Sequence, residues 1–191
     1  YSTLSVPKGR WYRGDLHTHT QHSDGAWSGA ELADAARQRG LDFIALTDHN
    51  TVTGLPEVLA AAGKDVLVIP GMELTTFFGH ALSLGLERWI DWRTEREGRT
   101  INDAAREIRQ AGGVFAIAHP DAPPDELCTG CHWAYTDFDL SLAHAVQVWG
   151  GSAWNCPGEF NPQCLARWQG WVNEGLGLAV IGGTDVHGPG G

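Results

Sequence analysis

The chain has 191 residues, of which 42% are hydrophobic and 19% are charged, enough apolar residues for the core of one ordinary domain. Its 23 acidic residues against 13 lysines and arginines give a net charge of −10, which argues against binding duplex nucleic acid through a basic surface. No apolar run approaches the roughly 20 residues that span a bilayer. We therefore expect a single domain over residues 1–191 that does not enter a membrane.

Seven apolar or β-branched segments alternate with helical patterns along most of the chain. An order of this kind favours parallel β/α units. The expected strands cover residues 15–19, 42–47, 66–70, 80–86, 114–118, 145–149 and 178–182.

Four helices are expected between these strands, and the first has the clearest boundaries. Ser28 and Glu31 have the spacing of a capping box, and Gly40 lies where such a helix would end. In the last helix, Asn161 precedes Pro162 as a capping residue would precede the first turn. The helices are expected at about residues 28–40, 54–63, 100–111 and 162–174.

Two long loops, residues 121–139 and 150–161, contain most of the cysteines together with proline and tryptophan. The even number of cysteines favours two disulfides and an oxidising compartment, periplasmic or extracellular. A structural zinc site, free thiols and a cytoplasmic location are the alternatives. The cysteines are Cys128, Cys131, Cys156 and Cys164.

Imidazole and carboxylate side chains follow the predicted strands at their carboxyl ends. In a parallel sheet or barrel these ends meet at one edge, where active sites are built. Each residue alone has an ordinary structural explanation as a cap, a turn or a surface side chain, but together they favour a Mn, Zn or Fe site. They are His17, His19, Asp48, His49, Glu73, His119, Asp185 and His187, with His22 close behind.

The spacing of these residues predicts a multinuclear hydrolytic centre. His17 and His19 lie two positions apart on a strand, which directs both rings to one face, and the same holds for Asp185 and His187. Glu73 can bridge two ions about 3.5–4 Å apart that share a hydroxide.

The order of the motifs resembles the PHP superfamily, named for polymerase and histidinol phosphatase, over nearly the whole chain. The segment Cys128-Thr-Gly-Cys-His-Trp and the strand that begins Gly79-His80 look most like its CehA/McbA branch. The motifs are Asp-Leu-His-Thr-His-Thr (15–20), Ser-Asp-Gly (23–25), Leu-Thr-Asp-His-Asn (46–50), Gly-Met-Glu (71–73), Ala-His-Pro (118–120) and Gly-Thr-Asp-Val-His (183–187).

The resemblance implies a distorted (βα)7 TIM-like barrel with two to three divalent ions at the carboxyl ends of the strands. It also adds His80 and Asp24, which the strand pattern does not single out, and it leaves Asp48 to orient His49 or its backbone. A strand that closes the barrel after His187 is not evident. The implied ligands are His17, His19, Glu73 and Asp185 for the first ion, Glu73, His80 and His119 for the second, and Asp24, His49 and His187 for the third.

The expected function is a metal-dependent hydrolase, in first place a phosphoesterase for small phosphate mono- or diesters. A hydroxide that bridges two ions would attack phosphorus in line, and His187 or His49 would protonate the leaving group if the third ion is absent. The alternative is a carboxylic ester, carbamate or amide hydrolase of the CehA/McbA kind with the same centre. A metal-binding domain without activity is a third hypothesis.

Two features would discriminate between the substrates. An arginine aimed at the ions favours the phosphoesterase, and the candidates are Arg13, Arg88, Arg93 and Arg96. An aromatic pocket favours the carbonyl ester, and it could be lined by Trp89, Trp92, Trp133, Trp149 and Trp154. Trp168 and Trp171 are expected to pack in the core instead.

Overall fold

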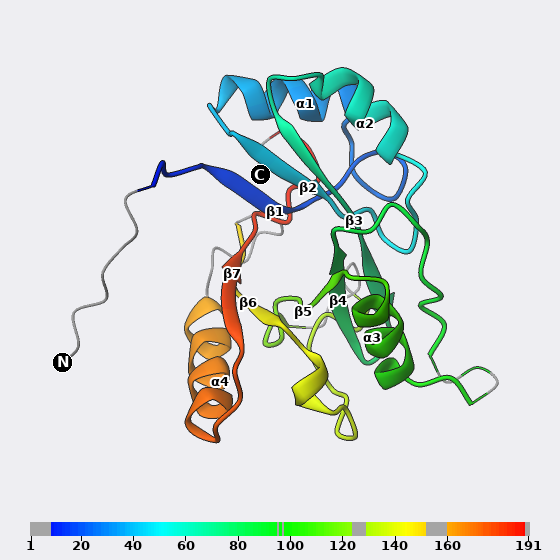
Figure 1. The fold of residues 1–191 in the computed structure, drawn as a ribbon, viewed down its shortest axis with the longest axis vertical. Coiled ribbons are helices and arrows are strands. Elements are labelled where there is room, and N and C mark those ends of the chain that lie inside the picture. The colour runs from blue at the N-terminus through cyan, green and yellow to red at the C-terminus, as the bar shows by residue number, and fades with distance from the viewer. Residues whose placement is uncertain (1–8, 95, 97, 124–128, 152–159, 190–191) are drawn as a thin grey trace.

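The computed structural model describes residues 9–94, 96, 98–123, 129–151 and 160–189 (Figure 1). Within these residues, seven strands form one sheet whose spatial order follows the order along the chain. The strands are β1 (Gly14–Thr18), β2 (Phe43–Leu46), β3 (Leu67–Thr76), β4 (Gly79–Leu84), β5 (Val114–Ile117), β6 (Ala145–Trp149) and β7 (Ala179–Gly182).

The sheet curls so that the segment after β7 reaches the end of β1. The backbone N–H of Asp185 donates to the carbonyl of His17 at 2.9 Å, and the N–H of His19 donates to the carbonyl of Val186 at 3.0 Å. Thr18 and Val186 form an isolated parallel bridge. The segment after β7 therefore lies along the end of β1, and the expected α/β fold with a curled, barrel-like sheet is confirmed.

The expected run of parallel units is wrong at β4, which is antiparallel to both β3 and β5. Only Phe77 and Phe78 separate β3 from β4, and parallel strands need a much longer crossover. β3 also continues beyond its expected end at residue 70. Gly71 belongs to the strand because a Cβ there would lie 2.5 Å from the carbonyl oxygen of Ser83, so this glycine permits close pairing and does not end the strand.

In the described part of the chain, four helices lie on the outside of the sheet (Figure 1). α1 and α2 share a core cluster with β2 and β3, α3 packs on β5, and α4 packs on β6. Among the described residues, no helix combines the length and the apolar composition that a membrane span requires. The helices are α1 (Gly29–Gln38), α2 (Leu55–Ala62), α3 (Ile101–Gln110) and α4 (Asn161–Asn173).

The helix boundaries agree with the expected capping signals in one case and differ in another. The capping box between Ser28 and Glu31 is confirmed. The expected cap of α4 is wrong, because Phe160 is the capping position and Asn161 begins the helix. The side chain of Asn161 instead bonds the backbone N–H and carbonyl of Gly150, at 2.9 and 3.2 Å. It therefore fastens α4 to the end of β6.

The expectation of two disulfides is wrong. Cys164 is a free thiol on the buried side of α4, where it belongs to the main core cluster. Its sulfur accepts a hydrogen bond from the backbone N–H of Asp121 at 3.4 Å. Cys131 is disulfide-bonded, whereas Cys128 and Cys156 lie outside the described residues. A cysteine pattern cannot reveal this difference, because pairing depends on how the helix packs.

Candidate metal centre

All nine expected ligand residues lie at one edge of the curled sheet. Most follow the carboxyl ends of parallel strands, as the sequence predicts. His80 joins them from the start of β4, because an antiparallel strand begins where its parallel neighbours end. The residues form three groups whose ligand atoms lie within 4.8 Å of one another: His17, His19, Glu73 and Asp185; His80, His119 and Cys131; His19, Asp24, His49 and His187.

The first group is almost completely buried. His17 Nε2 lies 3.1 Å from Glu73 Oε2 and 3.2 Å from Asp185 Oδ1. His19 Nε2 lies 2.9 Å from the same oxygen of Asp185. Two imidazoles and two carboxylates thus converge from β1, β3 and the segment after β7, at distances that a single cation could share.

The carboxylate of Glu73 connects this group to its neighbours. Its Oε2 faces His17 and also His49 Nδ1, the latter at 3.0 Å. Its Oε1 faces His80 Nδ1 at 3.0 Å and His119 Nε2 at 3.2 Å. Because each oxygen serves a different set of imidazoles, this carboxylate has the placement of a bridge between two ions.

The second group contains a residue that the sequence analysis missed. Cys131 comes close to His80 and His119, but its sulfur is disulfide-bonded and so is no thiolate ligand. No signal in the sequence places Cys131 here, because the course of the long loop brings it to the site. Glu73 Oε1 provides the charged donor of this group.

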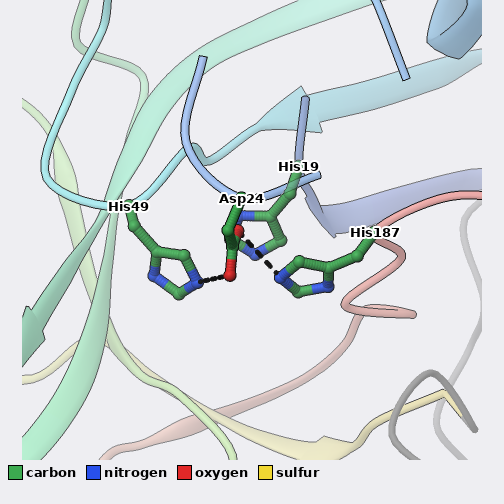
Figure 2. Close-up of side chains that lie close together, drawn as sticks. All are labelled: His19, Asp24, His49 and His187. Atoms are coloured by element: carbon green, nitrogen blue, oxygen red, sulfur yellow. Dashed lines mark ion pairs between the residues drawn. The ribbon is translucent and has the colours of Figure 1, made fainter. Parts of the chain in front are cut away.

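The third group lies at the mouth of the site (Figure 2). Asp24 projects between two imidazoles, with Oδ1 3.2 Å from His187 Nε2 and Oδ2 3.5 Å from His49 Nε2. The Asp24 side chain is 45% exposed, whereas His19 behind it is fully buried. The centre is therefore open to solvent on this side.

Hydrogen bonds to the far ring nitrogens determine how two of the histidines are protonated. His17 Nδ1 lies 2.9 Å from Gln147 Oε1, and the amide of Gln147 is oriented by its own N–H bond to the carbonyl of Gly183. His17 Nδ1 must therefore donate. His80 Nε2 likewise donates to the carbonyl of Thr129 at 3.0 Å. The other nitrogen of each ring then presents its lone pair to Glu73, an arrangement typical of metal-ligating histidines.

Buried polar atoms in this region require a cation. Among the described residues, His17 Nε2, His19 Nδ1 and Glu73 Oε2 are buried without a hydrogen bond of normal geometry. Lone pairs that face one another at about 3 Å repel unless a proton or a metal ion lies between them. The donor set therefore fits several divalent cations.

Without metal, protons take the place of that charge. Burial disfavours the charged form of His17, but Asp185 and Glu73 outweigh it and raise the pKa of His17 to about 9. Burial lowers the pKa of His19 to about 3. Burial also opposes the charge of Glu73, yet the imidazoles of His17 and His49 hold the pKa of this carboxyl well below its usual value. A metal ion must displace these protons to bind.

The backbone is strained at three positions of this edge. Asn50, His119 and Asp185 have φ angles of 56°, 24° and 57°, in the left-handed region. Such conformations cost on the order of 1–3 kcal/mol each and persist where neighbours hold them. The hydrogen bond from Asp185 N–H to the carbonyl of His17 is one such restraint. The strain lies where ligand side chains are aimed.

The carboxylate of Asp48 was expected to orient His49 or its backbone, but it bonds Thr20 and Ser23 instead. Its carboxylate accepts hydrogen bonds from the backbone N–H and hydroxyl of Thr20, at 2.7 and 2.8 Å, and from the hydroxyl of Ser23 at 2.9 Å. It thus orders the loop that carries Asp24. His22 lies outside the three groups and bonds Thr53 and Glu57 instead.

The described ion pairs of the candidate arginines do not involve the metal centre. Arg88 and Arg93 pair with Glu107 and Asp91, and Arg13 and Arg96 are exposed. The ion pairs between described arginines and described carboxylates all lie outside the three groups.

Of the expected pocket-lining tryptophans, Trp92 lines a cavity beside the centre. Trp133 is buried in the core and Trp149 is 67% exposed, while Trp154 lies outside the described residues. Trp89 is partly exposed and donates to the carbonyl of Asn50. Trp168 and Trp171 pack on the core, as expected.

Comparison with known proteins gives matches over most of the chain. The PHP domain matches residues 15–148. An uncharacterised protein of Methanocaldococcus jannaschii is 26% identical over 140 residues, which are 67% of this chain and 77% of that protein. A 3',5'-nucleoside bisphosphate phosphatase of Chromobacterium violaceum is 37% identical over 78 residues, 38% of this chain but 27% of the phosphatase.

Among solved structures, the fold is similar to a two-domain protein of Bacteroides vulgatus that contains a predicted PHP-like metal-dependent phosphoesterase. The TM-score is 0.71 at 24% identity, over 93% of this chain and 52% of that one. This chain therefore spans about half of the two-domain protein and about a quarter of the phosphatase.

Proposed function

Because this chain belongs to the PHP domain family, we propose that it is a metal-dependent phosphoesterase that hydrolyses small phosphate mono- or diesters. The observation that carries the proposal is the carboxylate of Glu73, whose two oxygens face different pairs of imidazoles within 3.0–3.2 Å. Phosphoryl transfer at neutral pH benefits from two cations held at such a bridge.

The proposed ligands follow the three groups. Each of the three groups would hold one divalent ion, Mn, Zn or Fe, with Glu73 in place of Cys131 in the second group. The third group is the most accessible to solvent. When bound, the ions would lower the pKa of water and neutralise charge on the phosphoryl oxygens. The assignment is His17, His19, Glu73 and Asp185 for the first ion, Glu73, His80 and His119 for the second, and Asp24, His49 and His187 for the third.

Two side chains at the mouth would handle the proton of the leaving group. Burial lowers the pKa of His187, but the hydrogen bond to the neighbouring Asp24 carboxylate outweighs it and raises this pKa above its ordinary value. In an enzyme with two ions, His187 donates that proton, with His49 as the second candidate. In an enzyme with three ions both imidazoles are ligands, and a water molecule must take over this part.

A second candidate is hydrolysis of a carboxylic ester, carbamate or amide, as in the CehA/McbA branch. One observation favours it: the described ion pairs of the candidate arginines lie outside the centre. The pocket that Trp92 and Phe77 line suits an aryl ester of either class. The same residues would then act on a carbonyl carbon, and the ions would stabilise an oxyanion.

The test compares both substrate classes on protein loaded with Mn²⁺. Phenyl phosphate and a phenyl carbamate are offered side by side, with the His17→Ala/His19→Ala double variant as the blank and metal content measured for both proteins. Turnover of the phosphate that the double variant loses supports the phosphoesterase. Turnover of the carbamate alone overturns it in favour of the second candidate. Background rates for both substrates on fully loaded protein contradict either hydrolase.

A further inference from the structure

A pocket of about 260 Å³ opens beside the metal centre, on the side of β3 and the turn that follows it. Sites for drug-sized ligands usually measure about 300–1,000 Å³, so this pocket suits a single ring system. Its lining residues are Asn50, Thr75, Thr76, Phe77, Trp92 and Thr129.

Two lining residues of the pocket also contact histidines of the centre. The hydroxyl of Thr75 lies 2.5 Å from His49 Nδ1, and the carbonyl of Thr129 accepts the hydrogen bond from His80 Nε2. The rings of His49 and His80 are 5.9 Å apart, edge to face. A group in the pocket would therefore lie next to the imidazoles that surround Glu73.

The polar side chains of Asn50, Thr75 and Thr76 are already hydrogen-bonded within the protein. The amide of Asn50 donates to the carbonyl of Thr75 at 3.0 Å and accepts from its N–H at 2.8 Å. The hydroxyl of Thr76 donates to the carbonyl of Gly79 and lies 2.7 Å from the phenol of Tyr135. What remains for a ligand is mainly apolar surface.

Two aromatic rings provide that surface. Trp92 packs against the core from one side, whereas Phe77, in the turn between β3 and β4, is 76% exposed. Pockets for small molecules are lined mainly by hydrophobic and aromatic side chains, so the two rings give this pocket a suitable wall. Among the described residues, no lysine or arginine belongs to the lining, so these residues offer no charge to a second phosphate.

We propose that this pocket binds a single aromatic ring, the leaving group of the substrate, while the ester group lies at the metal centre. The inference rests on the proposed function and narrows it to aryl esters. Esters of sugars and esters that carry a further phosphate would gain nothing from this pocket. Contact with an aromatic ring contributes about 0.5–1.5 kcal/mol beyond burial, which is about two- to tenfold in affinity.

The experiment measures equilibrium binding by calorimetry with two non-hydrolysable probes, phenylphosphonate and methylphosphonate, on Mn²⁺-loaded protein. The variants are Phe77→Ala, the conservative Phe77→Tyr, and Trp11→Ala, which removes another exposed aromatic ring outside the pocket lining. The wild type is expected to bind phenylphosphonate about tenfold more tightly than methylphosphonate. Phe77→Ala should weaken phenylphosphonate about fivefold and leave methylphosphonate unchanged, while Phe77→Tyr and Trp11→Ala keep the wild-type ratio.

Equal affinities for the two probes, or a phenyl preference that Phe77→Ala leaves intact, would overturn the aromatic pocket while the phosphoesterase stands. Absence of metal-dependent binding of either probe overturns the phosphoesterase, and the inference with it. The two failures are thus distinct.

Discussion

Gln147 on β6 places its Oε1 2.9 Å from Nδ1 of His17 on β1, across 130 positions of the chain. Both side chains are fully buried. Because Gln147 also donates to the carbonyl of Gly183, its amide has one orientation, and His17 must direct its other nitrogen to Glu73 and Asp185. A residue that is not itself an expected metal ligand thus sets the orientation of one that is.

Replacing Gln147 should weaken metal binding without emptying the site. Gln147→Met keeps the length of the side chain but removes the acceptor, so the ring of His17 loses its orientation. Loss of such a partner typically costs about 10- to 100-fold in metal affinity. Calorimetric titration with Mn²⁺ measures the change, and Gln163→Met, on the exposed side of α4, is the control. Unchanged affinity in Gln147→Met would contradict the orienting role.

Metal should stabilise the protein more at alkaline than at acidic pH. Burial opposes charge on His17 and His49, but Asp185 and Glu73 for His17, and Glu73 and Asp24 for His49, raise their pKa values to about 9 and about 11. These protons stabilise the metal-free fold fully below pH 6.5, and that stability is lost as pH rises through the folded pKa values. Metal must displace the same protons, so its binding strengthens over this window.

The measurement is the melting temperature with EDTA and with Mn²⁺ at pH 6, 7.5 and 9. The difference between the two should grow with each step. The variant His22→Ala, which alters a histidine outside the three groups, should show the same trend. A difference that shrinks as pH rises would contradict the proton–metal competition.

Removing the Asp48 carboxylate should loosen the loop that carries Asp24. Asp48→Ala deletes the acceptor for Thr20 and Ser23, and each hydrogen bond to a buried charged group is worth about 1.5–3 kcal/mol. We expect a lower free energy of unfolding and a loss of metal from the third group only. Urea unfolding and metal stoichiometry test this, against Asp42→Ala, a carboxylate at the opposite end of β2. Retention of all bound metal would count against the loop-ordering role.

The thiol of Cys164 should be present but slow to react. Burial raises its pKa to about 11, so little thiolate exists at pH 8, and the side chain is inaccessible. Labelling with iodoacetamide followed by peptide mass analysis should modify Cys164 rapidly in urea and at least tenfold more slowly in the native protein. A peptide that remains unlabelled in urea without reductant would mean that Cys164 is disulfide-bonded after all.

Much of this fold follows from local properties of the chain. The capping box at Ser28 predicts α1, and helical segments between most of the apolar runs predict the common direction of six strands. The antiparallel direction of β4 was not predicted, because it depends on the short turn between β3 and β4. Pro70-Gly71 resembles a break in β3, yet Gly71 serves close pairing with β4.

The sequence by itself determined that imidazoles and carboxylates follow the strands, and therefore that they gather at one edge of the sheet. Only the tertiary structure decided that Asp48 holds the Asp24 loop, that Gln147 orients His17, that Cys164 stays unpaired, and that Phe77 and Trp92 border one cavity. The physical reason is the distance along the chain over which each interaction acts. Periodicity and capping act over a few residues and are visible in the chain, whereas a hydrogen bond or a cavity between distant segments exists only once packing has brought them together.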